Sequence, residues 1–424
     1  MSTYLTTELV ISAYTSNPTL NAARQELRAV NETLPQALAG YRPNLSSFAN
    51  AGGAYEFTED DNPAVATAAA GVTLTQPLYR GGRTTAGVSG AQNRVLSQRE
   101  IYRDAEQEVL LQAANAHLDV LHDQQILGLA RENEAKLSAQ LSAFRRQLKA
   151  GAATKTDIAQ GESRLAQTQA GVAEAEANLA ASWALFYEVV GTTAEALKPA
   201  NASRYIIPAN RDEALMLALQ NSPTAGAAYF AEIASKFDVD VAAGWSKPQA
   251  DLVGSVQYFS EAADDLDDEF AAARLELRVT VPLYDGGVYG SQKRQSVNVA
   301  AQRRAQLLAA RRQVEREANG AWKGWTTAKI RVERLISALE AARNAVDGLR
   351  EERRLGERTA IDLLDGEQEL LSASIALAEA KTSLLSARLQ VLASIGAFPA
   401  NKLELNTRAY DAEADFQIIR DRWF

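Results

Sequence analysis

The sequence lacks the residue types on which much redox, nucleophilic and metal chemistry depends. Its 424 residues include no cysteine and only two histidines, His117 and His122. Without cysteine, disulfides, thiolate nucleophiles, cysteine-ligated metals and lipid attachment through cysteine are excluded. The two histidines are five positions apart and do not share one face of a helix, so they make a poor metal pair. We therefore expect no metal site and no cofactor.

Other features are also missing, and each argues against a class of protein. The chain has 44 basic and 53 acidic side chains, a net charge of −9, so it has no basic surplus for binding a nucleic acid. No apolar run reaches about 18 residues, which argues against a transmembrane helix. The N-terminal sequence MSTYLTTELV lacks a basic segment followed by an apolar stretch. We therefore expect either a cytosolic chain or a processed form whose signal peptide was removed or replaced.

Proline is absent from two long parts of the chain. The eleven prolines leave 78–198 and 283–398 free of proline, and both spans are rich in good helix formers. Apolar side chains recur there at steps of three and four residues, as at Leu335, Leu339 and Val346, which is typical of a coiled coil. At about 1.5 Å per residue, a helix over 85–149 would be roughly 100 Å long.

The chain also repeats itself. A shift of 205 positions superposes prolines and glycines that helical composition alone would not match: Pro18 on Pro223, Pro43 on Pro248, Pro77 on Pro282, Gly161 on Gly366, and Gly191 on Gly396. We predict two structural repeats. Residues 1–205 would hold a helix, two strands (about 44–80), a long helix (about 83–149) and a further helix (about 155–190). Residues 206–424 would hold a helix, two strands (about 250–284), a long helix (about 288–354), a helix (about 360–395) and a C-terminal segment.

One predicted strand alternates clearly between apolar and polar side chains. Leu275, Leu277 and Val279 alternate with Arg274, Glu276 and Arg278. This alternation fits a tilted membrane-spanning strand with its apolar side toward lipid, and it fits a half-buried soluble sheet equally well. Four strands cannot close a barrel, so several chains would have to pool them. Acidic loops at 59–61 and 264–269 are expected to be solvated, the alternative being a divalent-ion or lipid-headgroup role.

The repeated motifs resemble the TolC family of outer-membrane efflux and export ducts. They are Asn17-Pro18, residues 40–43 (GYRP), 76–82 (QPLYRGG), 281–287 (VPLYDGG) and 356–365 (GERTAIDLLD). The resemblance implies an α+β fold and a homotrimer. Each protomer would give four strands to a shared twelve-stranded transmembrane β-barrel, long antiparallel helices to a periplasmic coiled-coil tunnel, and an equatorial C-terminal segment. Such proteins are passive exit ducts in a Gram-negative outer membrane, and they dock with a periplasmic adaptor (membrane fusion) protein and an inner-membrane transporter.

Two expected helix–helix turns, at 148–154 and 354–359, are candidates for the gate. Thr154 with Asp157, and Thr359 with Asp362, have the spacing of a capping box. The resemblance implies that Asp362 and Asp365 ring a narrow periplasmic aperture. Three chains would then place six carboxylates near one axis, which would raise some of their pKa values and attract cations.

The same resemblance implies links that hold the aperture shut and a surface that binds the adaptor. Asp157, Thr156, Arg353 and Arg358 are the candidates for the links, although Arg353 departs from the tyrosine of the best-known member. The candidates for adaptor docking are the exposed tips, Gly151, Ala152, Leu355 and Gly356. The simpler alternative for these tips is an ordinary hairpin turn.

Other interpretations stay open at this point. A soluble coiled-coil scaffold would explain the long helices, but not the alternating strand or the repeated prolines and glycines. An enzyme with a site between the repeats is disfavoured, because no Ser/His/Asp set, phosphate-binding loop or metal motif occurs. The sequence does not choose between a duct for small molecules and one for secreted proteins.

Overall fold

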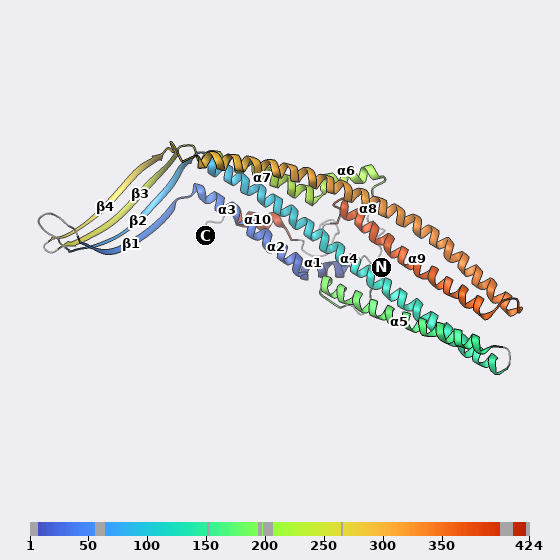
Figure 1. Ribbon diagram of the computed structural model, residues 1–424. Coiled ribbons are helices and arrows are strands. Elements are labelled where there is room, and N and C mark those ends of the chain that lie inside the picture. The colour runs from blue at the N-terminus through green and yellow to red at the C-terminus, as the bar shows by residue number, and fades with distance from the viewer. Residues whose placement is uncertain are drawn as a thin grey trace. The chain divides into compact units, whose positions relative to one another are not determined.

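The computed structural model describes residues 7–55, 64–150, 153–193, 197, 207–263, 266–398 and 410–420. These residues are mostly helical and contain one four-stranded antiparallel sheet, which confirms the predicted fold class (Figure 1). Within them, no helix is both long enough and apolar enough to cross a membrane.

In the part of the first half that the structure describes there are five helices, a short 3-10 turn and two strands. They are α1 (Thr7–Ser16), α2 (Pro18–Asn31), α3 (Thr33–Leu38), η1 (Ala39–Tyr41), β1 (Asn44–Tyr55), β2 (Ala64–Arg80), α4 (Arg83–Lys149) and α5 (Lys155–Val190). The second half contains α6 (Arg211–Asn221), α7 (Pro223–Gly244), β3 (Gln249–Ala263), β4 (Leu266–Thr280), α8 (Val288–Arg354), α9 (Ala360–Ser394) and α10 (Ala412–Arg420).

The glycines that match between the two halves have matching conformations. Gly81 and Gly82 have φ of 63° and 83°, and Gly286 and Gly287 have φ of 68° and 89°. Glycine adopts positive φ without the steric cost that other residues pay. The Gly-Gly pair therefore permits the tight turn from strand to long helix in each half of the chain.

The predicted extent of the last strand, to about residue 284, is wrong. β4 ends at Thr280, which pairs with Gln249, the first residue of β3. Pro248 comes next in that direction, and a proline has no N–H to donate. Val281 and Leu283 continue the apolar–polar alternation in the sequence, but they lie beyond the last paired residue of the strand. The alternation alone therefore predicted a strand that was too long.

Two compact units can be distinguished, and each draws on both halves of the sequence. Unit 1 comprises Met1–Arg24, Ile101–Ala225 and Arg311–Tyr410; unit 2 comprises Gln25–Glu100, Gly226–Ala310 and Asp411–Phe424. A compact unit is therefore not the same as a sequence repeat, and the division into two repeats stays a prediction.

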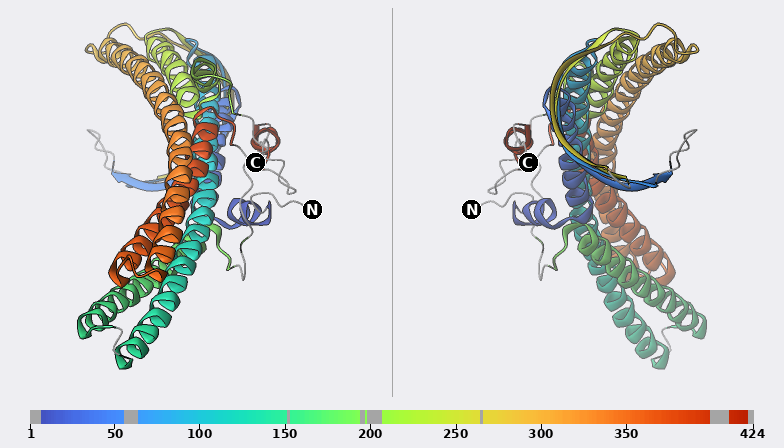
Figure 2. Two further views of the ribbon diagram at one scale, coloured as in Figure 1. Left: turned by 90° about the vertical axis from the view of Figure 1, so that its right-hand side faces the viewer. Right: turned by 90° about the vertical axis from the view of Figure 1, so that its left-hand side faces the viewer.

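Unit 2 contains the sheet, whose strands lie in the order β1-β2-β3-β4 and form one curved layer (Figure 2). Cross-strand pairs such as Leu252 with Leu277 put apolar side chains on one face, where Leu275, Leu277 and Val279 are 74%, 62% and 59% exposed. The other face pairs Asp251 with Arg278. One sheet face is therefore apolar and uncovered. The opposite face carries charged side chains near the end at Asp251 and the stacked rings of Phe259 and Phe270 nearer the other end.

Unit 1 contains two antiparallel hairpins, the first formed by α4 and α5 and the second by α8 and α9 (Figure 1). The base of α5 packs on α1 around Phe186, which is fully buried. The Asn17 side chain donates to the Val189 carbonyl at 3.0 Å and accepts from the Leu20 amide at 3.1 Å. Asn17 thus caps α2 and ties it to the first hairpin.

Candidate gating site at the hairpin turns

The first hairpin turn lies between α4 and α5. Gly151 and Ala152, two of the predicted docking residues, lie outside the described residues. Thr154 caps α5: its hydroxyl accepts from the Asp157 amide at 3.2 Å, and the Asp157 carboxylate accepts from the Thr154 amide at 2.8 Å. The Thr154 amide and the Thr154 hydroxyl, which lies 2.7 Å from the Asp157 carboxylate, both donate to the charged form and so lower the pKa of Asp157.

The second hairpin turn follows α8. The Gly356 amide donates to the Arg353 carbonyl at 3.0 Å, and the Glu357 amide donates to the Glu352 carbonyl at 2.9 Å. With Gly356 at φ 83°, this is a Schellman motif, which needs a left-handed residue after the helix. Leu355 is 65% exposed, so the predicted docking tip does present an apolar side chain.

Thr359 and Asp362 repeat the capping box at the start of α9. The Asp362 carboxylate accepts from the Thr359 amide at 2.9 Å and from its hydroxyl at 2.8 Å. These bonds lower the pKa of Asp362, and the nearby Arg358 lowers it further. A ring of carboxylates would raise these pKa values only through neighbouring copies. Within one chain, the hydrogen bonds of the cap have the largest effect on the pKa of Asp362.

The predicted closing link between Asp157 and Arg358 is not formed within one chain. Asp157 is engaged by its own cap, and Arg358 Nε lies 2.8 Å from the Glu352 carboxylate. Each side chain is satisfied by a neighbour in its own turn. Thr156 is exposed on α5. The Arg353 guanidinium lies 5.1 Å from the centre of the Phe144 ring, so it joins α8 to α4 by a cation–π contact.

Asp365 does join the two hairpins, through a residue that the sequence did not single out. Its carboxylate forms an ion pair with Arg164 on α5. The Asp365 side chain is 60% exposed and the Arg164 side chain 30% exposed. A local pattern could not have identified Arg164, because its partner lies 201 positions away.

Glu367 is a second link that sequence reasoning missed. Its carboxylate accepts from Gln140 Nε2 on α4 at 2.5 Å and pairs with Arg350 on α8 at 3.1 Å. Only 13% of the Glu367 side chain is exposed. Glu367 therefore holds three long helices together through one carboxylate.

Small and apolar residues bring these helices close enough for such links. Leu137, Phe144 and Leu364 form a buried cluster between the hairpins. Within each hairpin, a glycine allows close packing: a Cβ on Gly161 would lie 3.1 Å from Leu141, and one on Gly366 would lie 2.6 Å from Leu349. This close approach explains why the two glycines recur at matching positions.

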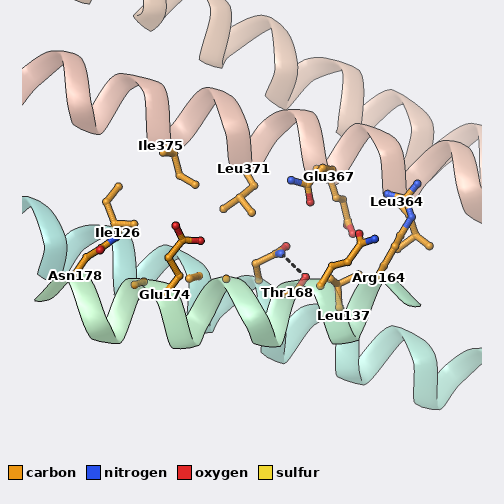
Figure 3. Close-up of a pocket in the computed structure, with 16 residues that line it drawn as sticks. Ile126, Leu137, Arg164, Thr168, Glu174, Asn178, Leu364, Glu367, Leu371 and Ile375 are labelled. Carbon is orange, nitrogen blue, oxygen red and sulfur yellow. Dashed lines mark hydrogen bonds between the residues drawn. The ribbon is translucent and has the colours of Figure 1, made fainter. Parts of the chain in front are cut away.

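A cavity of about 490 Å³ lies behind the apolar cluster, between α4, α5 and α9 (Figure 3). Leu371 and Ile375 of α9 face it from one side, and Ile126 faces it from the other. Arg164 and Glu367 lie at its end nearest the turns. Along this stretch α9 leaves a gap beside the first hairpin. The gap separates the contacts near the turns from a contact further along, where the Ser386 hydroxyl donates to Asn115 Oδ1 at 2.8 Å.

The contacts at this site are ion pairs, hydrogen bonds and apolar packing. No group of three His, Asp or Glu side chains among the described residues is placed to hold a metal ion. Near the turns, two polar links and one small apolar cluster hold α9 to the first hairpin. Contacts of this kind can break and re-form without covalent chemistry.

Comparisons with known proteins agree over nearly the whole chain. A model of the family described as outer membrane efflux protein matches residues 9–192 and 214–397. The chain is 31% identical to outer membrane efflux protein BepC of Brucella suis biovar 1 (strain 1330) over 422 residues, which is 99% of this chain and 91% of that protein. It is 27% identical to proteases secretion protein PrtF of Dickeya chrysanthemi, over 77% of this chain and 72% of that protein.

The fold is also that of solved channels. The Campylobacter jejuni CmeC outer membrane channel superposes with a TM-score of 0.83, covering 97% of this chain and 88% of that chain at 14% identity. At this identity the likeness concerns the fold alone. Together with the family match over both halves of the sequence, it confirms the resemblance to TolC: the chain belongs to the outer membrane efflux protein family.

Proposed function

We propose that the chain is an exit duct of the Gram-negative outer membrane, a passive channel for efflux or type I secretion. Family membership supports this function, and the single structural observation that carries it is the uncovered apolar face of the sheet. An apolar face of this kind suits contact with lipid, and the charged side chains on the face behind it suit a water-filled lumen. A soluble coiled-coil scaffold would have no use for such a face.

The edges of the sheet support a homotrimer. β1 and β4 are the first and last strands of the sheet, so each has one edge without a partner in the described chain. An open edge in lipid leaves backbone groups unsatisfied, at a cost of several kcal/mol each. If β1 of one copy pairs with β4 of the next, three copies close a twelve-stranded barrel and no edge is left.

We further propose a gate at the hairpin turns. Asp362 and Asp365 of three copies would ring the aperture, while the links at Arg353 and Arg358 would act between copies as well as within one. The tips at Leu355 and Gly356, together with 151–152, would bind a periplasmic adaptor, which acts with an inner-membrane transporter. Adaptor binding would favour a state in which α8 and α9 swing outward, a two-state change driven by a partner.

Single-channel conductance in a planar lipid bilayer tests the duct and its gate. Purified protein should give small, long-lived, cation-selective steps that a polyvalent cation blocks from one side only. The Asp365→Ala variant should lose most of this block, and Arg358→Ser should raise the conductance by loosening the closed state. Folded protein that never inserts would contradict the duct, whereas unchanged block in Asp365→Ala would remove only Asp365 from the aperture.

A further inference from the structure

The ion pair between Arg164 and Asp365 has a consequence for the selectivity of the aperture. We propose that Arg164 is the counter-charge of Asp365 and determines how strongly the aperture attracts cations, so that the closed aperture is partly neutralised and separation of α9 from α5 exposes the full carboxylate charge. This inference rests on the proposed function, because it requires Asp365 to face the aperture.

The pairing is specific, because the neighbouring acidic groups have other partners. Glu162, two positions before Arg164, pairs with Arg145 at 2.8 Å within the first hairpin. Glu367, two positions after Asp365, is engaged by Gln140 and Arg350. Asp362 is held by its cap. Arg164 therefore has Asp365 as its partner among these carboxylates.

The two members of the pair lie on helices that would separate when the gate opens. Arg164 is on α5 of the first hairpin, and Asp365 is on α9 of the second. Behind them lies the cavity of about 490 Å³, where α9 lacks close packing against the first hairpin (Figure 3). Once the contacts near the turns break, little packing along the cavity resists a movement of this end of α9, whereas the hydrogen bond from Ser386 to Asn115 lies further along the helix. Such a movement takes Asp365 away from its counter-charge.

The pair is exposed enough for ions to sense its charge. With 60% of the Asp365 side chain and 30% of the Arg164 side chain in contact with solvent, a mobile polyvalent cation competes with the guanidinium for the carboxylate. A cation is then attracted more strongly to an aperture whose aspartates have lost their arginines. Screening by salt would reduce this difference, as for other exposed charges.

The test compares Arg164→Gln with a matched control, Arg145→Gln, in the bilayer assay with a trivalent cation as blocker. Both variants remove one arginine from an ion pair, but Arg145 pairs with Glu162 within the first hairpin, whereas Arg164 pairs with Asp365 of α9. Arg164→Gln should be blocked at a concentration roughly threefold to tenfold lower than the parent, because three partly exposed counter-charges are lost at once. Arg145→Gln should be blocked at the same concentration as the parent.

A double-mutant cycle shows whether Arg164 acts through Asp365. In an Asp365→Asn background, the further change Arg164→Gln should leave the remaining block unchanged. An equal effect of Arg164→Gln with and without Asp365, or the same block in Arg164→Gln and Arg145→Gln, would overturn the inference and leave the duct intact. Parent protein that forms no channels would contradict the proposed function instead.

Discussion

Replacing Glu367 by glutamine removes one charge at the point where the two hairpins are joined and preserves the size of the side chain. The Glu367 carboxylate accepts from Gln140 at 2.5 Å and lies 3.1 Å from the Arg350 guanidinium. A glutamine amide can still accept the hydrogen bond from Gln140, but as a neutral acceptor it makes a weaker bond than the carboxylate does. We therefore expect Glu367→Gln to weaken the closed arrangement of the hairpins.

The size of the effect follows from the hydrogen bond that crosses between the hairpins. Only the hydrogen bond from Gln140 joins the two hairpins, because Arg350 and Glu367 both belong to the second hairpin. A hydrogen bond to a charged group contributes about 1.5–3 kcal/mol and one to a neutral group about 0.5–1.5 kcal/mol, so the loss is about 1 kcal/mol per chain. If three copies open together, the losses add to about 3 kcal/mol, which shifts the closed-to-open equilibrium roughly a hundredfold.

The open probability of single channels measures this shift directly. The control is Glu162→Gln, which removes the same charge from a pair formed within one hairpin, with a side chain 51% exposed. Glu367→Gln should open far more often than the parent, and Glu162→Gln should behave like the parent. An open probability that is unchanged in Glu367→Gln, or equally raised in both variants, would refute the role of Glu367 as a closing link.

Other variants test packing, backbone conformation and capping. Leu364→Ala should lower the free energy of unfolding by about 2 kcal/mol in a denaturant titration, because Leu364 is buried in the cluster between the hairpins, whereas Leu371→Ala at the cavity should cost clearly less. Gly191→Ala should lower the melting temperature, because φ is 76° there and a Cβ would lie 2.8 Å from Ser16. Gly171→Ala, in open space on α5, should raise it by the equivalent of up to about 1 kcal/mol, and a fall would contradict the helix assignment. The cap at Asp362 predicts a pH dependence: its pKa is lowered by folding, so its stabilisation is present above the unfolded pKa of about 3.9 and is lost as the pH falls through the folded pKa. The difference in melting temperature between the parent and Asp362→Ala should therefore be seen at pH 7 and shrink below about pH 4, and a constant difference would show that the charge of Asp362 does not stabilise the cap.

Features that depend on local sequence could be predicted, because the information lies within a few residues. Threonine three positions before aspartate predicted both capping boxes, at Thr154 and Thr359. The family was predicted from short motifs around Pro77 and Pro282, and the comparisons confirm it. The strands β1 and β2 alternate poorly in sequence, since they are rich in glycine and alanine, yet they pair fully. Their pairing depends on backbone hydrogen bonds, which composition hardly reveals.

The contacts between helices could not be predicted. Whether Arg164 faces Asp365 depends on the rotation and relative height of two helices that are 201 positions apart in the chain. The contact between Gln140 and Glu367, which are 227 positions apart, also depends on how two helices are rotated and shifted relative to each other. The links proposed from the resemblance, such as Asp157 with Arg358, assume the geometry of another protein and a neighbouring copy. Their roles in the gate stay predictions.

The free edges of β1 and β4 also bear on biogenesis. A strand edge with no partner in its own chain is prone to pair wrongly with other chains. The barrel that we propose can close only when copies meet, so its formation becomes a reaction between molecules, and its rate must rise with protomer concentration. Until copies meet, each newly made protomer exposes two unpaired strand edges and an apolar sheet face to solvent. Periplasmic chaperoning of the nascent protomer would therefore matter more for this chain than for a barrel that closes on itself.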